Sequence, residues 1–121
     1  MEIKLADPDK MNLVGYFLRD LLTTNLTSEK RQKMARHLKG AILFNASGML
    51  VTLTFHGEYI ELHPGIANQT NSKIAGDLNA LLDVALGANY LKYLLTRKIK
   101  IGGNVFKLLK LLKLLSKSKL T

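Results

Sequence analysis

The end of the sequence limits the fold more than any other feature. Residues 106–115 read Phe-Lys-Leu-Leu-Lys-Leu-Leu-Lys-Leu-Leu, and Asn104 before them is a preferred N-cap residue. On a helix, Lys107, Lys110, Lys113 and Lys117 share an arc of roughly 120°. Val105 and most of the leucines share roughly 160°, whereas Leu114 and Phe106 fall among the lysines and are expected to be partly exposed. A wide apolar face of this kind has to be covered, either by the rest of the protein or by a membrane.

The same segment carries all of the excess charge. Residues 1–91 contain nine Lys/Arg and nine Asp/Glu, whereas residues 92–121 contain nine Lys/Arg and no acidic residue. A nucleic-acid-binding domain usually spreads its basic surface over one face of the fold. Here the charge belongs to one terminal segment with few interleaved aromatic residues, so nucleic acid is not expected as a partner.

Three interpretations of the terminal helix remain open. It can be an ordinary docking helix with a solvated lysine face, a lid that docks on the protein and also touches lipid, or a tail bound only to a membrane. An apolar face bordered by Lys is typical of helices that lie on a membrane surface.

The first third of the chain favours helices over residues 8–38. Asp7-Pro8-Asp9 reads as a helix start, with Asp7 as the cap, and an amphipathic pattern then continues to about Leu26. Thr27 or Ser28 can cap a second helix that ends near Leu38.

The hydrophobic period then changes from 3.6 to 2 over residues 41–101. Residues 41–45, 50–55 and 58–63 alternate as strands and are separated by turns at Ser47-Gly48 and His56-Gly57, which predicts an antiparallel meander. A short strand at 72–75 follows. Asp77 caps a helix that ends at Gly87, 90–95 is helical, and 98–101 is a last strand.

Several functional classes lack their sequence signals. The chain has no Cys, no secretory signal and no transmembrane stretch, so we expect a single cytoplasmic domain over residues 1–121. It has no Gly-x-Ser-x-Gly motif and no evident nucleophile–base pair. His56 and His63, with Glu58 and Glu61 between them, are a conceivable metal or acid–base site, but solvated turn residues are the favoured interpretation. We therefore expect no enzyme activity, no catalytic residue, no metal and no cofactor.

Three stretches in a fixed order resemble the sterol carrier protein 2 (SCP2) family of lipid-binding domains. They are the hairpin at 41–55, the Ile74-Ala75-Gly76-Asp77-Leu78 passage with Leu81-Leu82 and Gly87 after it, and Lys98–Ile101 with Gly103-Asn104 leading into the leucine-rich helix. The resemblance covers residues 38–115, although a small residue is usual where this chain has Arg97.

The resemblance implies an α+β fold. It would have a five-stranded, mainly antiparallel sheet with helices on one side and an apolar tunnel between them. The sheet and its helices would span residues 41–101, and the closing helix residues 104–117. The tunnel of this family takes sterols, fatty acyl chains, acyl-CoA or phospholipids, and the family has no catalytic residues of its own.

The residues expected to line such a tunnel come from both layers. They are Val51, Leu53, Phe55, Leu78, Leu82, Leu86, Leu94, Ile101, Val105, Leu108, Leu109 and Leu112. Lys107, Lys110 and Lys113 are expected to contact a membrane or a lipid headgroup.

The leading hypothesis is therefore a lipid carrier whose terminal helix serves as lid or membrane contact, with a transient anionic membrane as a partner. The alternative is a non-catalytic accessory module that presents isoprenoid- or quinone-type substrates to a partner enzyme.

Overall fold

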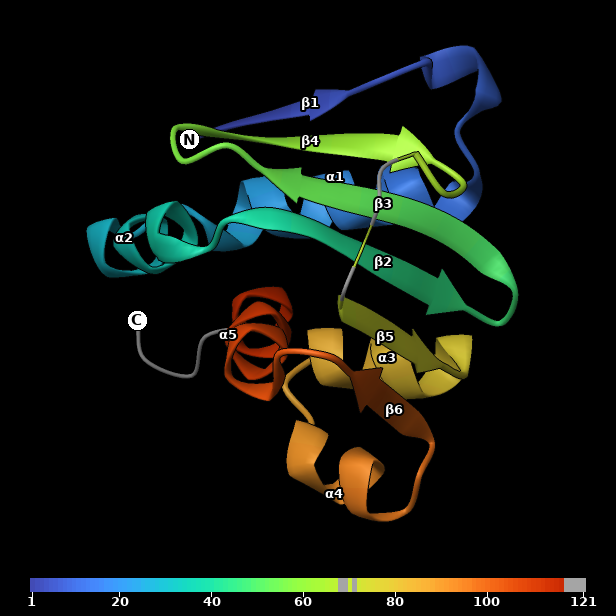
Figure 1. Ribbon diagram of the computed structural model, residues 1–121. Helices are drawn as coiled ribbons and strands as arrows, with labels where there is room; N and C mark the ends of the chain where they lie inside the picture. The colour runs from blue at the N-terminus through green and yellow to red at the C-terminus, as the bar shows by residue number, and fades with distance from the viewer. Residues whose placement is uncertain (68–69, 71, 117–121) are drawn as a thin grey trace.

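A computed structural model gives the protein an α+β fold in which helices pack on one face of a six-stranded mixed sheet (Figure 1). It describes residues 1–67, 70 and 72–116. The strands are β1 (Glu2–Leu5), β2 (Gly40–Ala46), β3 (Met49–Phe55), β4 (Tyr59–Pro64), β5 (Ser72–Gly76) and β6 (Ile99–Gly102). They lie in the order β1-β4-β3-β2-β5-β6, with β1·β4 and β2·β5 parallel and the other pairs antiparallel.

Helices cover the inner face of this sheet. They are α1 (Leu13–Asn25), α2 (Glu29–His37), α3 (Leu78–Ala85), α4 (Tyr90–Leu95) and α5 (Val105–Leu115). Helix α1 packs on the β1, β3 and β4 half of the sheet, while α5 contacts β5, β6 and α1. Figure 1 shows α1 and α3 behind the sheet.

The expected count of five strands misses β1. Its residues alternate Glu, Ile, Lys, Leu, and Ile3 and Leu5 pair with Ile60 and Leu62 on the inner face. An alternation over four residues is too short to be recognised as a strand. Its parallel partner strand, β4, lies more than fifty residues later in the sequence.

The predicted meander is confirmed as β2, β3 and β4. Ser47 and Gly48 form the first turn with φ angles of 50° and 92°, and Gly48 N donates to the Asn45 side chain at 2.8 Å. A two-residue turn with positive φ angles matches the twist of the flanking strands. The register places Phe44 opposite Val51 and Leu53 opposite Leu62, so apolar side chains meet across the inner face.

Residue Thr52 shows where the alternation rule is incomplete. It points to the outer face as predicted, yet it is fully buried. Its hydroxyl donates to Gly65 O at 2.7 Å and accepts from Ala67 N at 3.1 Å. The chain after β4 therefore folds over the outer face of β3, and Thr52 fastens it there.

The predicted start of the first helix is wrong. Asp7 adopts φ 47° and makes no side-chain cap, and only a 3₁₀ turn follows at Pro8–Lys10. Helix α1 begins at Leu13, where the Asn12 side chain accepts from Gly15 N at 3.0 Å and donates to Leu50 O at 3.0 Å. The chain leaves β1 at the sheet edge and must turn before it can cross the inner face, so the helix starts later.

The other predicted helix caps are confirmed. The backbone conformation at Arg97, just before β6, also explains why a small residue is usual at that position. Ser28, Asp77 and Asn104 each accept a backbone N–H at the start of α2, α3 and α5. Arg97 has φ 62°, a left-handed conformation that side chains rarely adopt. A glycine would reach it with less strain.

Helix α5 is buried more deeply than its sequence suggests. Leu108, Leu111, Leu112 and Leu114 are 0% exposed and Leu115 is 4% exposed. The prediction that Leu114 is partly exposed is wrong, because α1 and α2 cover that side: Asn25 and Arg31 both donate to Leu114 O. Phe106, by contrast, is 80% exposed. Lys117, predicted on the same helix, lies outside the described residues.

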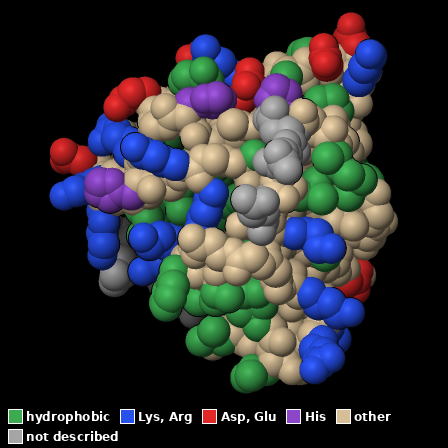
Figure 2. Space-filling model, viewed as in Figure 1, with side chains coloured by type: hydrophobic (Ala, Val, Ile, Leu, Met, Phe, Trp, Pro, Cys, Tyr) green, Lys and Arg blue, Asp and Glu red, His purple; other side chains and the backbone are tan. Residues whose placement is uncertain are grey.

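Large apolar side chains that stay exposed are concentrated in one part of the described chain. Besides Leu13 and Ile66, they are Leu86 (78%), Leu91 (50%), Leu95 (85%), Val105 (47%) and Phe106 (80%). Figure 2 shows hydrophobic side chains gathered over α4 and the start of α5.

Among the described helices, none has the length and hydropathy needed to cross a bilayer.

Truncating Leu114 tests how firmly α5 is docked. Leu114→Ala is expected to lower the free energy of unfolding by about 2–5 kcal/mol, because it opens a cavity in a closely packed core. Phe106→Ala, on the same helix, should change it by less than about 0.5 kcal/mol, since the ring is exposed. Urea denaturation of both variants measures the difference, and equal small effects would show that α5 is not packed as described.

Candidate functional site

The candidate site is an apolar cavity where α1, β2, α3 and α5 meet. Its free volume is about 10 Å³, which is room for roughly one water molecule. The lining residues are Val14, Phe17, Leu18, Leu21, Phe44, Ala46, Leu78, Leu81, Val84, Leu112 and Leu115. Not one of them has a polar side chain, so the cavity can hold an apolar group but offers no side-chain hydrogen bond.

Helix α1 supplies four of the lining residues, and the predicted set contains none of them. Val14 and Leu18 are buried, whereas Phe17 and Leu21 are half-buried. The sequence signal was present, because these residues form two rows spaced four apart on one amphipathic helix. The predicted lining residues all lie between Val51 and Leu112 and therefore do not include α1.

The structure divides the predicted lining residues into four groups. Leu78 and Leu112 line the cavity. The core beyond the cavity buries Val51, Leu53, Phe55 and Leu108. Four more residues are half-buried between the core and solvent: Leu82, Leu94, Ile101 and Leu109. Leu86 and Val105 are exposed.

Hydrogen bonds hold the C-terminal end of α5 over the cavity. Asn25 Nδ2 donates to Leu114 O at 3.0 Å, and Arg31 donates to the same oxygen at 3.3 Å. Ser116 Oγ donates to Val84 O on α3 at 3.1 Å. Burial lowers the pKa of the Arg31 guanidinium below its ordinary value. The three contacts act as a latch that joins α5 to α1, α2 and α3; we call Asn25, Arg31 and Ser116 the latch.

The three lysines expected to contact a membrane are not equivalent. Lys110 and Lys113 are exposed, whereas Lys107 is half-buried. A Cβ atom at Gly40 would lie 3.0 Å from Lys107 Nζ, so the ammonium group lies against the start of β2. Burial lowers the pKa of Lys107 below its ordinary value of 10.5.

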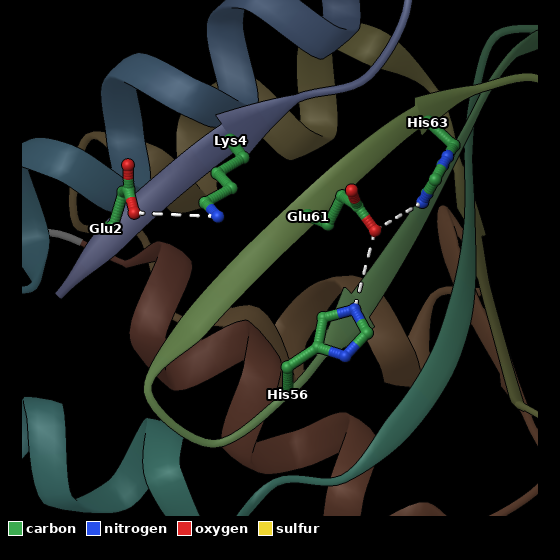
Figure 3. A network of polar contacts seen from close by, with 5 residues as sticks. All are labelled: Glu2, Lys4, His56, Glu61 and His63. Carbon is green, nitrogen blue, oxygen red and sulfur yellow. Dashed lines mark hydrogen bonds and ion pairs between the residues drawn. The ribbon is translucent and has the colours of Figure 1, made fainter.

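A second polar cluster occupies the outer face of the sheet, away from the cavity. Glu61 Oε1 lies 2.9 Å from His63 Nε2 and 3.4 Å from His56 Nε2 (Figure 3). The His56 ring stacks on Tyr59 at 4.5 Å, and Lys4 Nζ lies 4.3 Å from the Tyr59 ring. Within residues 1–67, 70 and 72–116 no group of three or more His, Cys, Asp or Glu is arranged to hold a metal ion. The cluster joins the β3–β4 turn to the outer face of β4.

Comparison with protein families gives this cavity its context. The model of the SCP-2 sterol transfer family matches residues 18–116, from α1 to the end of α5. The chain belongs to the SCP-2 sterol transfer family. The resemblance carried by the hairpin, the Gly76-Asp77 passage and the last strand is thereby confirmed. Members of this family bind sterols and other lipids, so an apolar ligand is the expected cargo of the fold. A search of curated protein sequences gives no significant match.

Solved structures confirm the fold. The UbiJ-SCP2 ubiquinone synthesis protein superposes with a TM-score of 0.67 at 15% identity, over 85% of this chain and 88% of that one. The sterol carrier protein domain 2 of Helicoverpa armigera gives 0.67 at 15% identity, over 93% and 94%. Sterol carrier protein 2 from Yarrowia lipolytica, in its apo form, gives 0.64 at 17% identity, over 91% and 92%. Identities this low establish a shared SCP2-like fold and leave the ligand open.

Removing the charge of Lys107 is expected to stabilise the protein at neutral pH. Because folding lowers the pKa of this lysine, the folded state binds the proton less tightly than the unfolded state, and the penalty is fully present below the folded pKa. It disappears as the pH rises through the folded pKa towards 10.5. Lys107→Met should therefore have a slightly higher urea midpoint than wild type at neutral pH, and this advantage should vanish at alkaline pH. Lys113→Met, at an exposed position on the same helix, serves as the control for removal of a surface lysine, and its urea midpoint should stay close to that of wild type.

Proposed function

We propose that the protein is a lipid carrier that holds one long apolar ligand between the sheet and helices α1, α3 and α5. The observation that supports this most directly is the wholly apolar cavity beneath α5 in a chain of the SCP-2 sterol transfer family. The ligand class is a sterol, fatty acyl chain, acyl-CoA or phospholipid-like molecule. Carriage needs no catalytic group, and the function proposed is not enzymatic.

The small volume of the cavity implies that uptake opens the structure. About 10 Å³ cannot hold an acyl chain, so some lining helix must move outwards. In our proposal α5 is the lid, because its Leu112 and Leu115 close the cavity and the three side-chain hydrogen bonds of the latch join its C-terminal end to α1, α2 and α3. Opening breaks the latch and separates α5 from α3, and the ligand replaces the leucine contacts that are lost.

Binding energy would come from burial of hydrocarbon. Each CH₂ group removed from water contributes about 0.8 kcal/mol, so a long chain can bind without a hydrogen bond. An aliphatic lining of Leu, Val and Phe suits ligands of variable shape. Lys110 and Lys113 on the exposed side of α5 would meet the headgroup or the membrane surface during exchange.

The alternative is an accessory module that presents an isoprenoid- or quinone-type substrate to an enzyme. Its support is the similarity of fold to the UbiJ-SCP2 ubiquinone synthesis protein. Transfer of lipid between vesicles by the purified protein alone favours the carrier, whereas transfer that requires an added enzyme favours the accessory role.

Filling the cavity tests the ligand site. Leu78→Trp places an indole ring, which is larger than the leucine side chain, at a half-buried lining position. The variant is expected to weaken uptake of a fluorescent fatty acid at least tenfold, because the ring competes with the ligand for the same space. Leu13→Trp adds the same ring at an exposed position and should bind like wild type. Titration of both variants gives the dissociation constants, and equal affinities would place the ligand elsewhere.

Weakening the latch tests the lid. Asn25→Ala removes one hydrogen bond to α5, which contributes about 0.5–1.5 kcal/mol, so bound lipid should dissociate roughly 2- to 10-fold faster. Amide exchange in residues 105–115 should rise with it. Asn79→Ala, at an exposed position on α3, is the matched control. A faster amide exchange without faster lipid release would show that α5 is not the gate.

A further inference from the structure

The exposed apolar side chains near α4 form a surface outside the cavity that the proposed lid closes. We define the α4 patch as Leu86, Leu91, Leu95, Val105 and Phe106. These five residues come from three neighbouring elements: the C-cap of α3, the exposed face of α4 and the first turn of α5. Leu91 and Leu95 are four apart and therefore share one face of α4.

The patch belongs to a well-anchored part of the fold. Tyr90, Tyr93 and Leu94 turn the opposite side of α4 towards the core. Tyr93 Oη also donates to Asp83 Oδ2 on α3 at 2.7 Å, and Lys98 N donates to Tyr93 O at 3.0 Å at the start of β6. Because these contacts fix α4 from behind, Leu91 and Leu95 have no partner within the described chain that could cover them.

Positive charge lies beside the α4 patch. Lys92, Arg97, Lys98 and Lys100 are exposed, and none of them forms an ion pair with a described residue. Asp83 is the last acidic residue of the whole sequence, and it is bonded to Tyr93. Figure 2 shows Lys and Arg side chains to the right of the hydrophobic group, and Asp77 lies near Arg97, Lys98 and Lys100 in one surface hollow. An apolar centre with a cationic border matches an anionic lipid surface, which offers hydrocarbon behind a layer of negative headgroups.

We propose that the α4 patch docks the protein on an anionic membrane. Phe106, Leu91 and Leu95 enter the headgroup boundary while Lys92, Lys98 and Lys100 meet the phosphates. This differs from contact through α5, whose leucine face is occupied by the core in the closed protein. A second copy of the chain fits the patch less well, since it would bring the same positive charge. The proposal rests on the proposed function, because docking serves the exchange of carried lipid.

Tryptophan fluorescence can locate the contact, because the chain contains no Trp. Phe106→Trp is mixed with vesicles of phosphatidylcholine and phosphatidylglycerol, and with vesicles of phosphatidylcholine alone. The expected result is a blue-shifted emission that brominated lipid quenches, seen with the anionic vesicles and reversed by high salt. Leu13→Trp, equally exposed but outside the patch, should keep the emission of a ring in water.

Two substitution sets separate the apolar and charged contributions. Leu91→Ser with Leu95→Ser, and separately Lys92→Gln with Lys98→Gln and Lys100→Gln, should each weaken association with anionic vesicles by roughly tenfold or more. Their matched controls are Leu13→Ser with Ile66→Ser, and Lys30→Gln with Lys33→Gln and Lys39→Gln, which should leave association unchanged. All sets alter exposed residues, so circular dichroism should show a folded protein.

Fatty-acid uptake measured without vesicles keeps this proposal distinct from the proposed function. The patch variants are expected to load ligand like wild type. Membrane docking would be contradicted if both sets of patch variants still bound anionic vesicles, or if the wild-type protein did not bind them. A protein partner would then be the remaining candidate for the α4 patch. A failure to load ligand in every variant, wild type included, would instead contradict the carrier function.

Discussion

The burial of α5 is the interaction on which the rest of the structure depends. The described helices cover one face of the sheet, and at its β5–β6 end α5 contacts both strands, where Ile74, Ile99 and Ile101 face the core. An eleven-residue helix that buries five leucines supplies that cover and touches α1, α2 and α3 as well. The core and the cavity therefore share one boundary, and a movement of α5 away from the cavity would also loosen the fold.

Much of this fold could be predicted from the sequence because its local signals agree with its tertiary contacts. Alternating residues gave β2, β3 and β4, and the side chains at Ser28, Asp77 and Asn104 marked three helix starts. The predictions fail where contacts between residues far apart in the sequence determine the local structure. Strand β1 exists because β4 offers it an edge, and the cap moves from Asp7 to Asn12 because Asn12 also binds Leu50 of β3.

The site was less predictable than the fold, for a physical reason. Periodicity tells which face of a helix is apolar, but not which apolar residues leave a gap when the faces meet. Leu78 and Leu112 of the predicted set lie at the cavity, whereas the α1 residues that line it are absent from that set even though their two rows can be read from the sequence. Leu114 lies among lysines on the helix and is nevertheless fully buried, because α1 and α2 close on α5 from a second side.

In the proposed carrier, the near-absence of free volume beneath α5 would make the closed protein its own competitor for cargo. Its leucines already occupy the space a ligand would take, so under this proposal the apparent affinity would equal the intrinsic affinity multiplied by the fraction of molecules that are open. A sequence change far from any ligand can then tune retention simply by shifting that fraction. The affinity for the ligand could therefore change during evolution without any new contact to the ligand. Only the equilibrium between the leucine-filled closed form and the lipid-filled open form would have to shift.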